Sequence, residues 1–329
     1  MHPNQILAEL TQFNGKPCVL DKIHLPYEQA NSGPATKFGL GAEFFLSDSD
    51  RACLRKRSIE FLTDFWHMFP NRIDEFVPTG TRKARKFKGN PNEALWGDCE
   101  SQSVDKGYST LMMGEVDIGL VKDDIKPYQA GVLARRSGDP RLSFVSAAMP
   151  VCNDDGDLNF DTLLSAVLRW SEICQPVHGT AGFCLIFASG MSQNTTYALQ
   201  LMKRYPGFHI SNAVDFSAET KLVHNRIKCA NWLTVLCDDL VTELGGKERM
   251  RAALEPECRI HDYPGGAVIQ AGANPQLGDT WRNDIPEAYR MVARYTRPIR
   301  FEGYTDGLFR VPDGLDDVEE ALSWVRRFD

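Results

Sequence analysis

The sequence lacks the short motifs that identify many enzymes. Its seven histidines include no His-Glu-x-x-His or His-x₃-His pair, and no Gly-x-Ser-x-Gly elbow offers a nucleophilic serine. The phosphate-loop pattern is absent, and Gly39-Leu40-Gly41 lacks the third glycine of a dinucleotide fingerprint. These absences favour a protein that is not an enzyme and has no catalytic residue, cofactor or metal.

The cysteines lack any pattern of a metal or redox site. They number nine, and no two stand at Cys-x-x-Cys spacing, so the sequence supports neither a zinc ribbon nor a thioredoxin-like site. Cys184 lies inside an apolar run and Cys237 follows another. We therefore expect free, buried thiols, which are typical of a reducing compartment.

Targeting and membrane-spanning segments are also missing. The first residues have neither a charged region nor a continuous apolar region of the kind found in signal peptides. No apolar run reaches the about 18 residues that would span a bilayer. The sequence predicts a cytoplasmic protein that makes no membrane contact.

Charge is unevenly distributed along the 329 residues. Ten basic and four acidic residues between 51 and 90 give that segment a net +6, which leaves −13 for the rest of a chain of net charge −7. The run Arg82–Lys88 could bind nucleic acid through its charges and Phe87, or it could be a solvated loop. The acidic balance makes nucleic-acid binding the weaker alternative.

Apolar periodicity predicts an α+β fold, with mixed, largely antiparallel sheet or sheets flanked by helices. Residues 70–110 carry prolines and glycines with little periodicity and are expected to form long loops. We expect a single domain over 1–329, with two closely packed subdomains, about 1–152 and 153–329, as the alternative. Strands are predicted at 38–46, 113–121, 131–135, 142–150, 180–188, 230–236, 258–263 and 267–271, and helices at 50–69, 160–174, 192–204, 238–244, 284–295 and from 316.

The C-terminal third is rich in turn-forming residues and poor in reactive ones. Pro264-Gly265-Gly266 predicts a β-hairpin turn between strands 258–263 and 267–271. The loop from Ile269 to Asp279 contains no Ser, Cys, His or Lys that could act as a nucleophile. This segment indicates a shaped scaffold rather than a catalytic centre.

Two acidic motifs have alternative interpretations. Glu219-Thr220-Lys221, with Asp215 upstream, could belong to a metal-dependent hydrolase with a third ligand elsewhere, but a surface segment is favoured. Asn153–Asp157 resembles a calcium loop, yet Val151 and Thr162 would occupy positions that need carboxylates. We expect an acidic turn that leads into a helix.

Several segments resemble the family of type VI secretion immunity proteins, some of which are partners of VRR-NUC-type nuclease toxins. The similarity is good over about 160–329 and loose over the first 110 residues. The matching segments include Leu163…Arg169-Trp170, Gly179–Phe183, Arg204–Phe208, Leu233–Leu236, Leu244–Gly246, Ile269–Gly272…Pro275…Gly278-Asp279, Arg297–Arg300 and Trp324…Arg327-Phe328-Asp329.

The resemblance implies a protein that binds and neutralises one cognate effector toxin, with no catalytic residue carried over. Because nuclease toxins need basic grooves, an acidic surface could cover one and speed association. Exposed acids are therefore the candidate partner-binding residues; the oligomeric state stays open. They are Asp123, Asp124, Asp154, Asp155, Asp157, Asp306, Asp313, Asp316 and Asp317.

Overall fold

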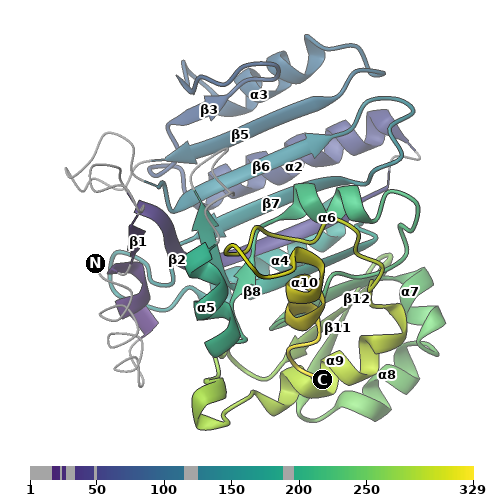
Figure 1. Cartoon of the computed structure of the whole chain (residues 1–329). Helices are drawn as coiled ribbons and strands as arrows, with labels where there is room; N and C mark the ends of the chain where they lie inside the picture. The colour runs from purple at the N-terminus through teal and green to yellow at the C-terminus, as the bar shows by residue number, and fades with distance from the viewer. Residues whose placement is uncertain (1–16, 23, 27–33, 48–49, 115–124, 188–195) are drawn as a thin grey trace.

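The fold is built on one sheet of twelve strands in a computed structural model of the chain (Figure 1). The structure describes residues 17–22, 24–26, 34–47, 50–114, 125–187 and 196–329. The strand order is β11-β12-β10-β8-β2-β7-β6-β5-β3-β4, with β1 paired to β2 and β9 to β8. The strands are β1 (His24–Pro26), β2 (Pro34–Leu46), β3 (Glu75–Val77), β4 (Arg85–Lys86), β5 (Tyr108–Gly114), β6 (Tyr128–Ala134), β7 (Ser143–Met149), β8 (His178–Phe187), β9 (His209–Ile210), β10 (Leu233–Cys237), β11 (Cys258–Tyr263) and β12 (Gly266–Ala271).

Neighbouring strands run antiparallel throughout the described sheet, except that β9 is parallel to β8. Helices cover both of its faces. They are α2 (Arg51–Met68), α3 (Pro91–Glu100), α4 (Phe160–Cys174), α5 (Thr196–Arg204), α6 (Ala213–Glu219), α7 (Asp238–Glu243), α8 (Lys247–Leu254), α9 (Glu287–Thr296) and α10 (Asp317–Val325), with short 3-10 turns η1 (Pro17–Lys22), η2 (Thr280–Arg282) and η3 (Arg297–Ile299). The predicted α+β class is confirmed.

The two central strands set the position of everything else. β2 and β8 pair from Thr36↔Phe187 to Phe45↔His178, so residues separated by more than 130 positions become neighbours. Alternate side chains of a strand point to opposite faces. Phe38, Leu40 and Phe44 thus face one layer of helices, while Glu43 and Phe45 lie on the other face.

The first face is covered by α2 and α4, which lie behind the sheet in Figure 1. Asp50 begins α2 by accepting a hydrogen bond from the backbone N–H of Cys53, 3.0 Å away. Phe61 meets Trp170 of α4 edge to face, with ring centroids 5.1 Å apart. Asp64 accepts from the indole N–H of Trp170 at 2.8 Å, so a polar contact orients the aromatic packing of the two helices.

The second face is covered by elements from later in the chain. α6 packs on β2 and β7, and Figure 1 shows α5, α6 and α10 in front of the sheet. Asn212, at the start of α6, donates its amide to the carbonyl of Leu308 at 2.7 Å. Glu219, at the end of α6, accepts from the backbone N–H groups of Thr305 and Asp306 at 2.8 and 2.6 Å. These bonds fix the segment 301–310 over the front of the sheet.

Much of the C-terminal half agrees with the sequence. α4 spans the predicted residues, and β11 and β12 form the predicted hairpin, with Gly265 at φ +108° in its turn. Asp316 begins α10 by accepting from the backbone N–H of Val318 and of Glu319, both at 2.9 Å. The predicted helix start at this position is confirmed.

The expectation of long loops over 70–110 is wrong. This segment contains β3, β4, α3 and the start of β5. Its strands are short and gain their order by pairing along the sheet, a tertiary effect that periodicity does not detect. Asn90 and Pro91 did carry a helix-start signal, because Asn90 caps α3 and Pro91 occupies its first turn. Of the strand predicted at 113–121, only Met113 and Gly114 belong to β5, which begins at Tyr108, and residues 115–121 lie outside the described ones.

Cys184 is a free, buried thiol, as expected, and Cys237 is free and half-buried. The sequence did not predict that two other cysteines are bonded to each other. Cys18 and Cys152 form a disulfide across a sequence separation of 134. Asp21 brings η1 to this point, because its carboxylate accepts from the backbone N–H of Val151 at 2.7 Å and of Cys152 at 2.9 Å.

Among the helices that the structure describes, none combines the length and apolarity needed to cross a membrane.

Candidate functional site

The predicted acidic residues fall into two separate exposed groups. Asp154, Asp155 and Asp157 lie in the turn between β7 and α4, where the backbone N–H of Asn153 donates to the carbonyl of Asp157 at 2.9 Å. Arg72 forms an ion pair with Asp154. This is the expected acidic turn before a helix. Asp123 and Asp124 lie outside the described residues.

The second group lies in front of the sheet. Asp306, Asp313, Asp316 and Asp317 are all exposed, and all belong to the segment that leads into α10. Glu219 of α6 binds the backbone N–H of Asp306, which places one more carboxylate beside this group. These acids therefore share a surface with α6, whereas the turn at 154–157 belongs to another part of the molecule.

The basic run lies at one end of the sheet. Arg85 and Lys86 form β4, the last strand beyond β3, and the basic side chains of the run are exposed. Phe87, however, stacks on Phe76, with ring centroids 4.7 Å apart. The Phe87 ring is thus already packed against Phe76 and is not free to stack on a base, which weakens the nucleic-acid interpretation of the run.

The Glu-x-Lys motif takes a structure unlike that of a metal-dependent hydrolase. Asp215 and Glu219 lie on α6, a helix of seven residues, and the Glu219 carboxylate is occupied by backbone N–H groups of the 301–310 segment. Among the described residues, no group of three or more His, Cys, Asp or Glu side chains is placed to hold a metal ion. The motif is part of the scaffold of the front face.

A buried charged cluster lies beneath α6 and was not predicted from the sequence. The Glu43 carboxylate on β2 accepts through Oε2 from Lys228 Nζ at 2.5 Å and from His209 Nε2 at 3.0 Å. Lys228 also donates to the carbonyl of Ile210 at 3.1 Å and to Asn212 Oδ1 at 2.7 Å. Because Lys228 is 0% exposed and Glu43 1%, each charge depends on the other for stabilisation.

The cluster shifts the ionisation of its members. Burial by itself would raise the pKa of Glu43, but Lys228 and His209 outweigh it and lower that pKa to about 2. His178 of β8 lies on the same face of the sheet as Glu43. Its ring stacks on Phe45, with centroids 4.7 Å apart, and meets Phe216 edge to face, with centroids 5.6 Å apart. Burial, together with the charge of Lys228, lowers the pKa of His178 to about 3, so this imidazole is neutral at physiological pH.

Cys229, with His209 and Glu43, forms the arrangement of described residues that most resembles a catalytic triad. Burial alone would raise the pKa of its thiol, but Arg327, His209 and Lys228 lower it to about 6. The Arg327 guanidinium donates to Cys229 Sγ at 3.8 Å. Yet Cys229 is 0% exposed, and a nucleophile must reach its substrate. The geometry therefore supports a structural contact between Cys229 and Arg327 within the core.

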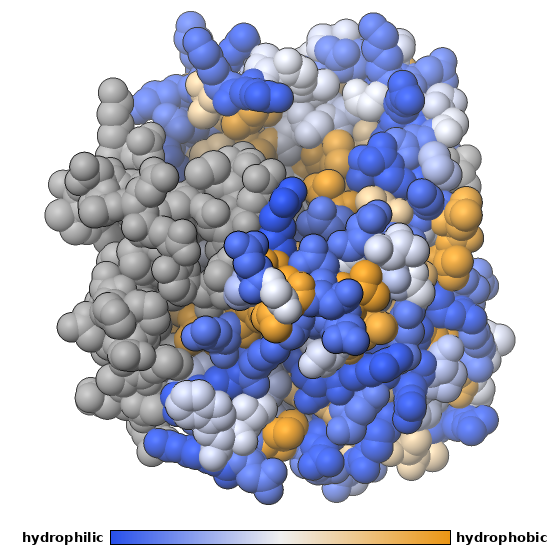
Figure 2. Space-filling model, viewed as in Figure 1, coloured by the Kyte–Doolittle hydropathy of each residue, from blue (hydrophilic) through white to orange (hydrophobic). Residues whose placement is uncertain are grey.

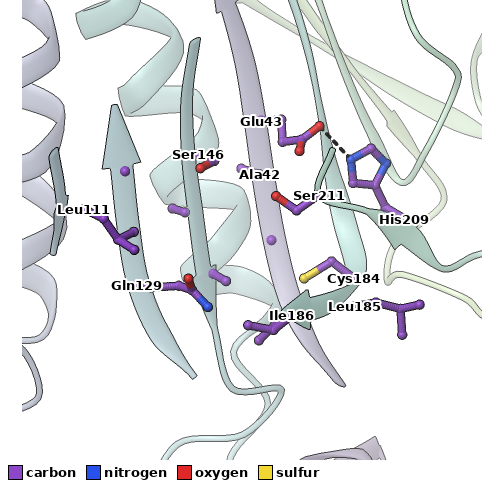
Figure 3. Close-up of a pocket in the computed structure, with 14 residues that line it drawn as sticks. Ala42, Glu43, Leu111, Gln129, Ser146, Cys184, Leu185, Ile186, His209 and Ser211 are labelled. Carbon is purple, nitrogen blue, oxygen red and sulfur yellow. Dashed lines mark hydrogen bonds and ion pairs between the residues drawn. The ribbon is translucent and has the colours of Figure 1, made fainter. Parts of the chain in front are cut away.

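A pocket opens on the front face beside this cluster (Figure 3). Its volume is about 150 Å³, and its floor is made of small buried residues such as Gly41, Gly131 and Ala148. Figure 3 shows Glu43 and His209 on one side of the pocket and Gln129 and Ser146 on the other. Its described lining consists of Gly41, Ala42, Glu43, Leu111, Gln129, Gly131, Ser146, Ala147, Ala148, Cys184, Leu185, Ile186, His209 and Ser211.

Sequence reasoning could have found part of this site. A lone glutamate within the apolar run Phe38–Leu46 is unusual for a strand, since a charged residue is seldom fully buried without a partner. That signal marks Glu43. It does not identify Lys228 or His209, which lie 185 and 166 residues away.

Comparison with known proteins places the chain among immunity proteins. A family model described as type VI immunity for VRR-NUC matches residues 85–328. Among solved structures, a type VI secretion system protein of Pseudomonas aeruginosa has the same fold, with a TM-score of 0.83 at 18% identity over 100% of this chain and 92% of that one. No curated protein matches the chain.

Proposed function

The chain belongs to the family of type VI immunity proteins for VRR-NUC, and on that basis we propose that it binds one cognate effector toxin and blocks the surface with which the toxin contacts nucleic acid. The single observation that carries this proposal is the family match over residues 85–328. A nuclease has a basic groove for its substrate, and an acidic partner can cover such a groove.

We propose the front face as the contact surface. It carries the exposed acids Asp306, Asp313, Asp316 and Asp317, and the bonds from α6 hold their segment in place. In the part of this face that the structure describes, Figure 2 shows mostly hydrophilic residues, with smaller apolar areas between them. An interface of the standard size buries about 800 Å² on each partner, which is only part of such a face.

The protein would act by binding and not by catalysis. Its nearest approach to a catalytic triad, Cys229 with His209 and Glu43, is closed off within the core. We further propose that the whole chain works as one unit in the cytoplasm, where a nuclease finds its substrate. Fractionation of cells that express the full chain tests the location.

Co-expression with the effector from the neighbouring gene tests the proposal directly. We expect cells with both proteins to survive, and a complex to elute in size-exclusion chromatography. Death of the cells without a complex would contradict the proposal.

Charge reversal then tests the surface. Replacing Asp306, Asp313 and Asp317 together by lysine should slow association strongly and reduce its dependence on salt. The same triple change at Asp154, Asp155 and Asp157 is the matched control, and it should leave association closer to that of the unmodified protein. An equal loss in both triple variants would indicate that net charge, and not the front face, determines binding.

A further inference from the structure

The side chain of Trp281, in the short turn η2, is 71% exposed. Tryptophan is highly buried on average, because removing its large apolar surface from water stabilises a fold. Single exposed apolar residues are nevertheless common in soluble proteins, so exposure alone does not indicate a partner. The way in which this ring is held provides a second, independent observation.

The Trp281 ring is held in position by a buried ion pair. Arg204, at the end of α5, places Cζ of its guanidinium 4.1 Å from the centroid of the indole ring. The two carboxylate oxygens of Asp279 bind Arg204 at 3.1 and 2.9 Å, and neither side chain is more than 10% exposed. Asp279 Oδ1 also accepts from the backbone N–H of Trp281 at 3.0 Å. Because the bidentate pair fixes the guanidinium, the indole that stacks on it is ordered before a partner binds.

A cavity of about 180 Å³ lies next to this turn, between α5 and α10. Thr280, which precedes Trp281 in η2, lines the cavity and donates its hydroxyl to the carbonyl of Lys203 at 3.0 Å. Lys203 of α5 in turn binds Glu320 of α10 at 2.6 Å. An exposed, ordered aromatic ring and a cavity therefore stand side by side on the surface.

The lining of this cavity matches an apolar side chain. Leu199 and Trp324 are buried and offer apolar contacts. The charges of Lys203 and Glu320 are already paired with each other, and Arg327 donates to backbone carbonyls at 2.6 and 2.9 Å. A cavity of about 150 Å³ with apolar walls holds one benzene ring, so this one has room for a side chain the size of leucine or phenylalanine.

The cavity belongs to the same surface as the acids that we propose as contacts. Asp316, at the start of α10, is followed by Glu320 and Ser323 at intervals of four and three residues, which places the three on one side of the helix. Glu320 and Ser323 line the cavity. Figure 1 shows α5 and α10 together in front of the sheet. One side of α10 thus leads from the exposed acids to the cavity beside Trp281.

We propose that Trp281 anchors the effector and that the cavity next to it receives one apolar side chain of the effector. The inference rests on the proposed function and names the centre of the same interface. Tryptophan is enriched among the residues that contribute most to binding, and a ring that is already ordered loses little freedom when a partner binds. The acids of the front face speed association, whereas Trp281 determines how long the complex lasts.

Trp281→Ala tests the anchor. We expect it to weaken binding of the effector from the neighbouring gene at least about 30-fold in calorimetry, the size of a hot-spot loss. Surface-plasmon kinetics should show faster dissociation with an unchanged association rate, the reverse of the result expected for the charge variants. Leu158→Ala is the control, because Leu158 is an exposed apolar residue in the turn between β7 and α4. It should keep the affinity of the unmodified protein, and thermal unfolding verifies that both variants are folded.

Filling the cavity tests its occupant. Ser323→Phe places a ring at the edge of the cavity, and we expect it to weaken binding at least about 10-fold. Ser165→Phe, at an exposed position of α4 behind the sheet, is the control and should keep the affinity. Each apolar residue of the effector is then replaced by alanine and titrated into the unmodified protein and into Ser323→Phe. One effector variant should lose affinity for the unmodified protein and lose little more with Ser323→Phe.

The outcomes are distinct. Unchanged affinity of Trp281→Ala would overturn the anchor, as would an equal loss in Leu158→Ala. Unchanged affinity of Ser323→Phe, an equal loss in Ser165→Phe, or the absence of any coupled apolar residue would overturn the occupant of the cavity. Failure of the unmodified protein to bind the effector at all would instead contradict the proposed function.

Discussion

Glu43 and Lys228 lie 185 residues apart in the sequence and meet in the core, with 2.5 Å between Oε2 and Nζ. Neither side chain is exposed to solvent beyond 1%. The pair joins the central strand β2 to the segment before β10, and through Asn212 it reaches α6 and the C-terminal segment. It is therefore a single polar connection between the sheet and the elements that cover its front face.

Loss of Lys228 should strongly destabilise the fold. Lys228→Met leaves the Glu43 carboxylate buried without its main counter-ion, and we expect the free energy of unfolding to fall by about 3–5 kcal/mol. Urea denaturation measures the change. Lys203→Met, at the half-exposed pair Lys203–Glu320, is the matched control and should cost about 1 kcal/mol or less. Equal losses at the two sites would show that burial of the pair is not what matters.

His178 should make the protein sensitive to acid. Its folded pKa of about 3 lies below the ordinary 6.5, so between these values the unfolded chain binds a proton that the folded protein does not. Stability must then fall as pH drops below about 6.5, by up to about 1.4 kcal/mol per pH unit. His178→Phe should remove this contribution. Glu43, whose pKa is lowered from 4.5 to about 2, adds a similar loss of stability as pH falls from about 4.5 to about 2. That second loss should persist in His178→Phe.

Urea denaturation at several pH values between 7 and 4 tests the role of His178. His67→Phe is the control, because His67 is exposed near the end of α2. It should keep the pH dependence of the unmodified protein. If His178→Phe retains that dependence too, the buried imidazole is not its source.

Asp316 allows charge to be separated from helix capping. Its side chain accepts from two backbone N–H groups at the start of α10. Asp316→Ala should lower stability by about 1 kcal/mol, whereas Asp316→Asn should preserve it, because asparagine caps equally well. Both remove the charge and should slow effector association equally at low salt. Slower association of the alanine variant alone would mean that α10, and not the charge, matters for binding.

Arg300 should require its planar guanidinium. It binds both carboxylate oxygens of Asp329 at 2.6 Å, with only 2% of its side chain exposed. Arg300→Lys keeps the charge but loses the two-pronged contact, and we expect thermal unfolding to show a loss of about 2–3 kcal/mol. Arg326→Lys is the control, because Arg326 binds Glu302 at the exposed side of the same group. Its loss should be below about 1 kcal/mol.

Local sequence patterns were sufficient for many of the elements. The apolar stripe of α4, the turn between β11 and β12, and the cap of α10 are each encoded within a few consecutive residues, and the structure confirms all three. The family resemblance was carried by the same kind of feature. Arg300 and Asp329, both within resembling segments, prove to be partners.

The errors occurred where order depends on distant partners. β3 and β4 have three and two residues, too few for periodicity to be visible, and each is stabilised by pairing with a neighbouring strand. The disulfide of Cys18 and Cys152 likewise depends on a contact that Asp21 makes far along the chain. A short window of sequence around one of these residues does not contain its partner.

By itself, the sequence determined the class of fold, most helix and strand positions in the C-terminal half and the resemblance to immunity proteins, because these depend on periodicity and turn chemistry within short segments. Only the tertiary structure decided that Glu43, His209 and Lys228 form one buried cluster and that a pocket of about 150 Å³ opens beside it. Strand order brings these residues together, and strand order is set by packing of the whole chain.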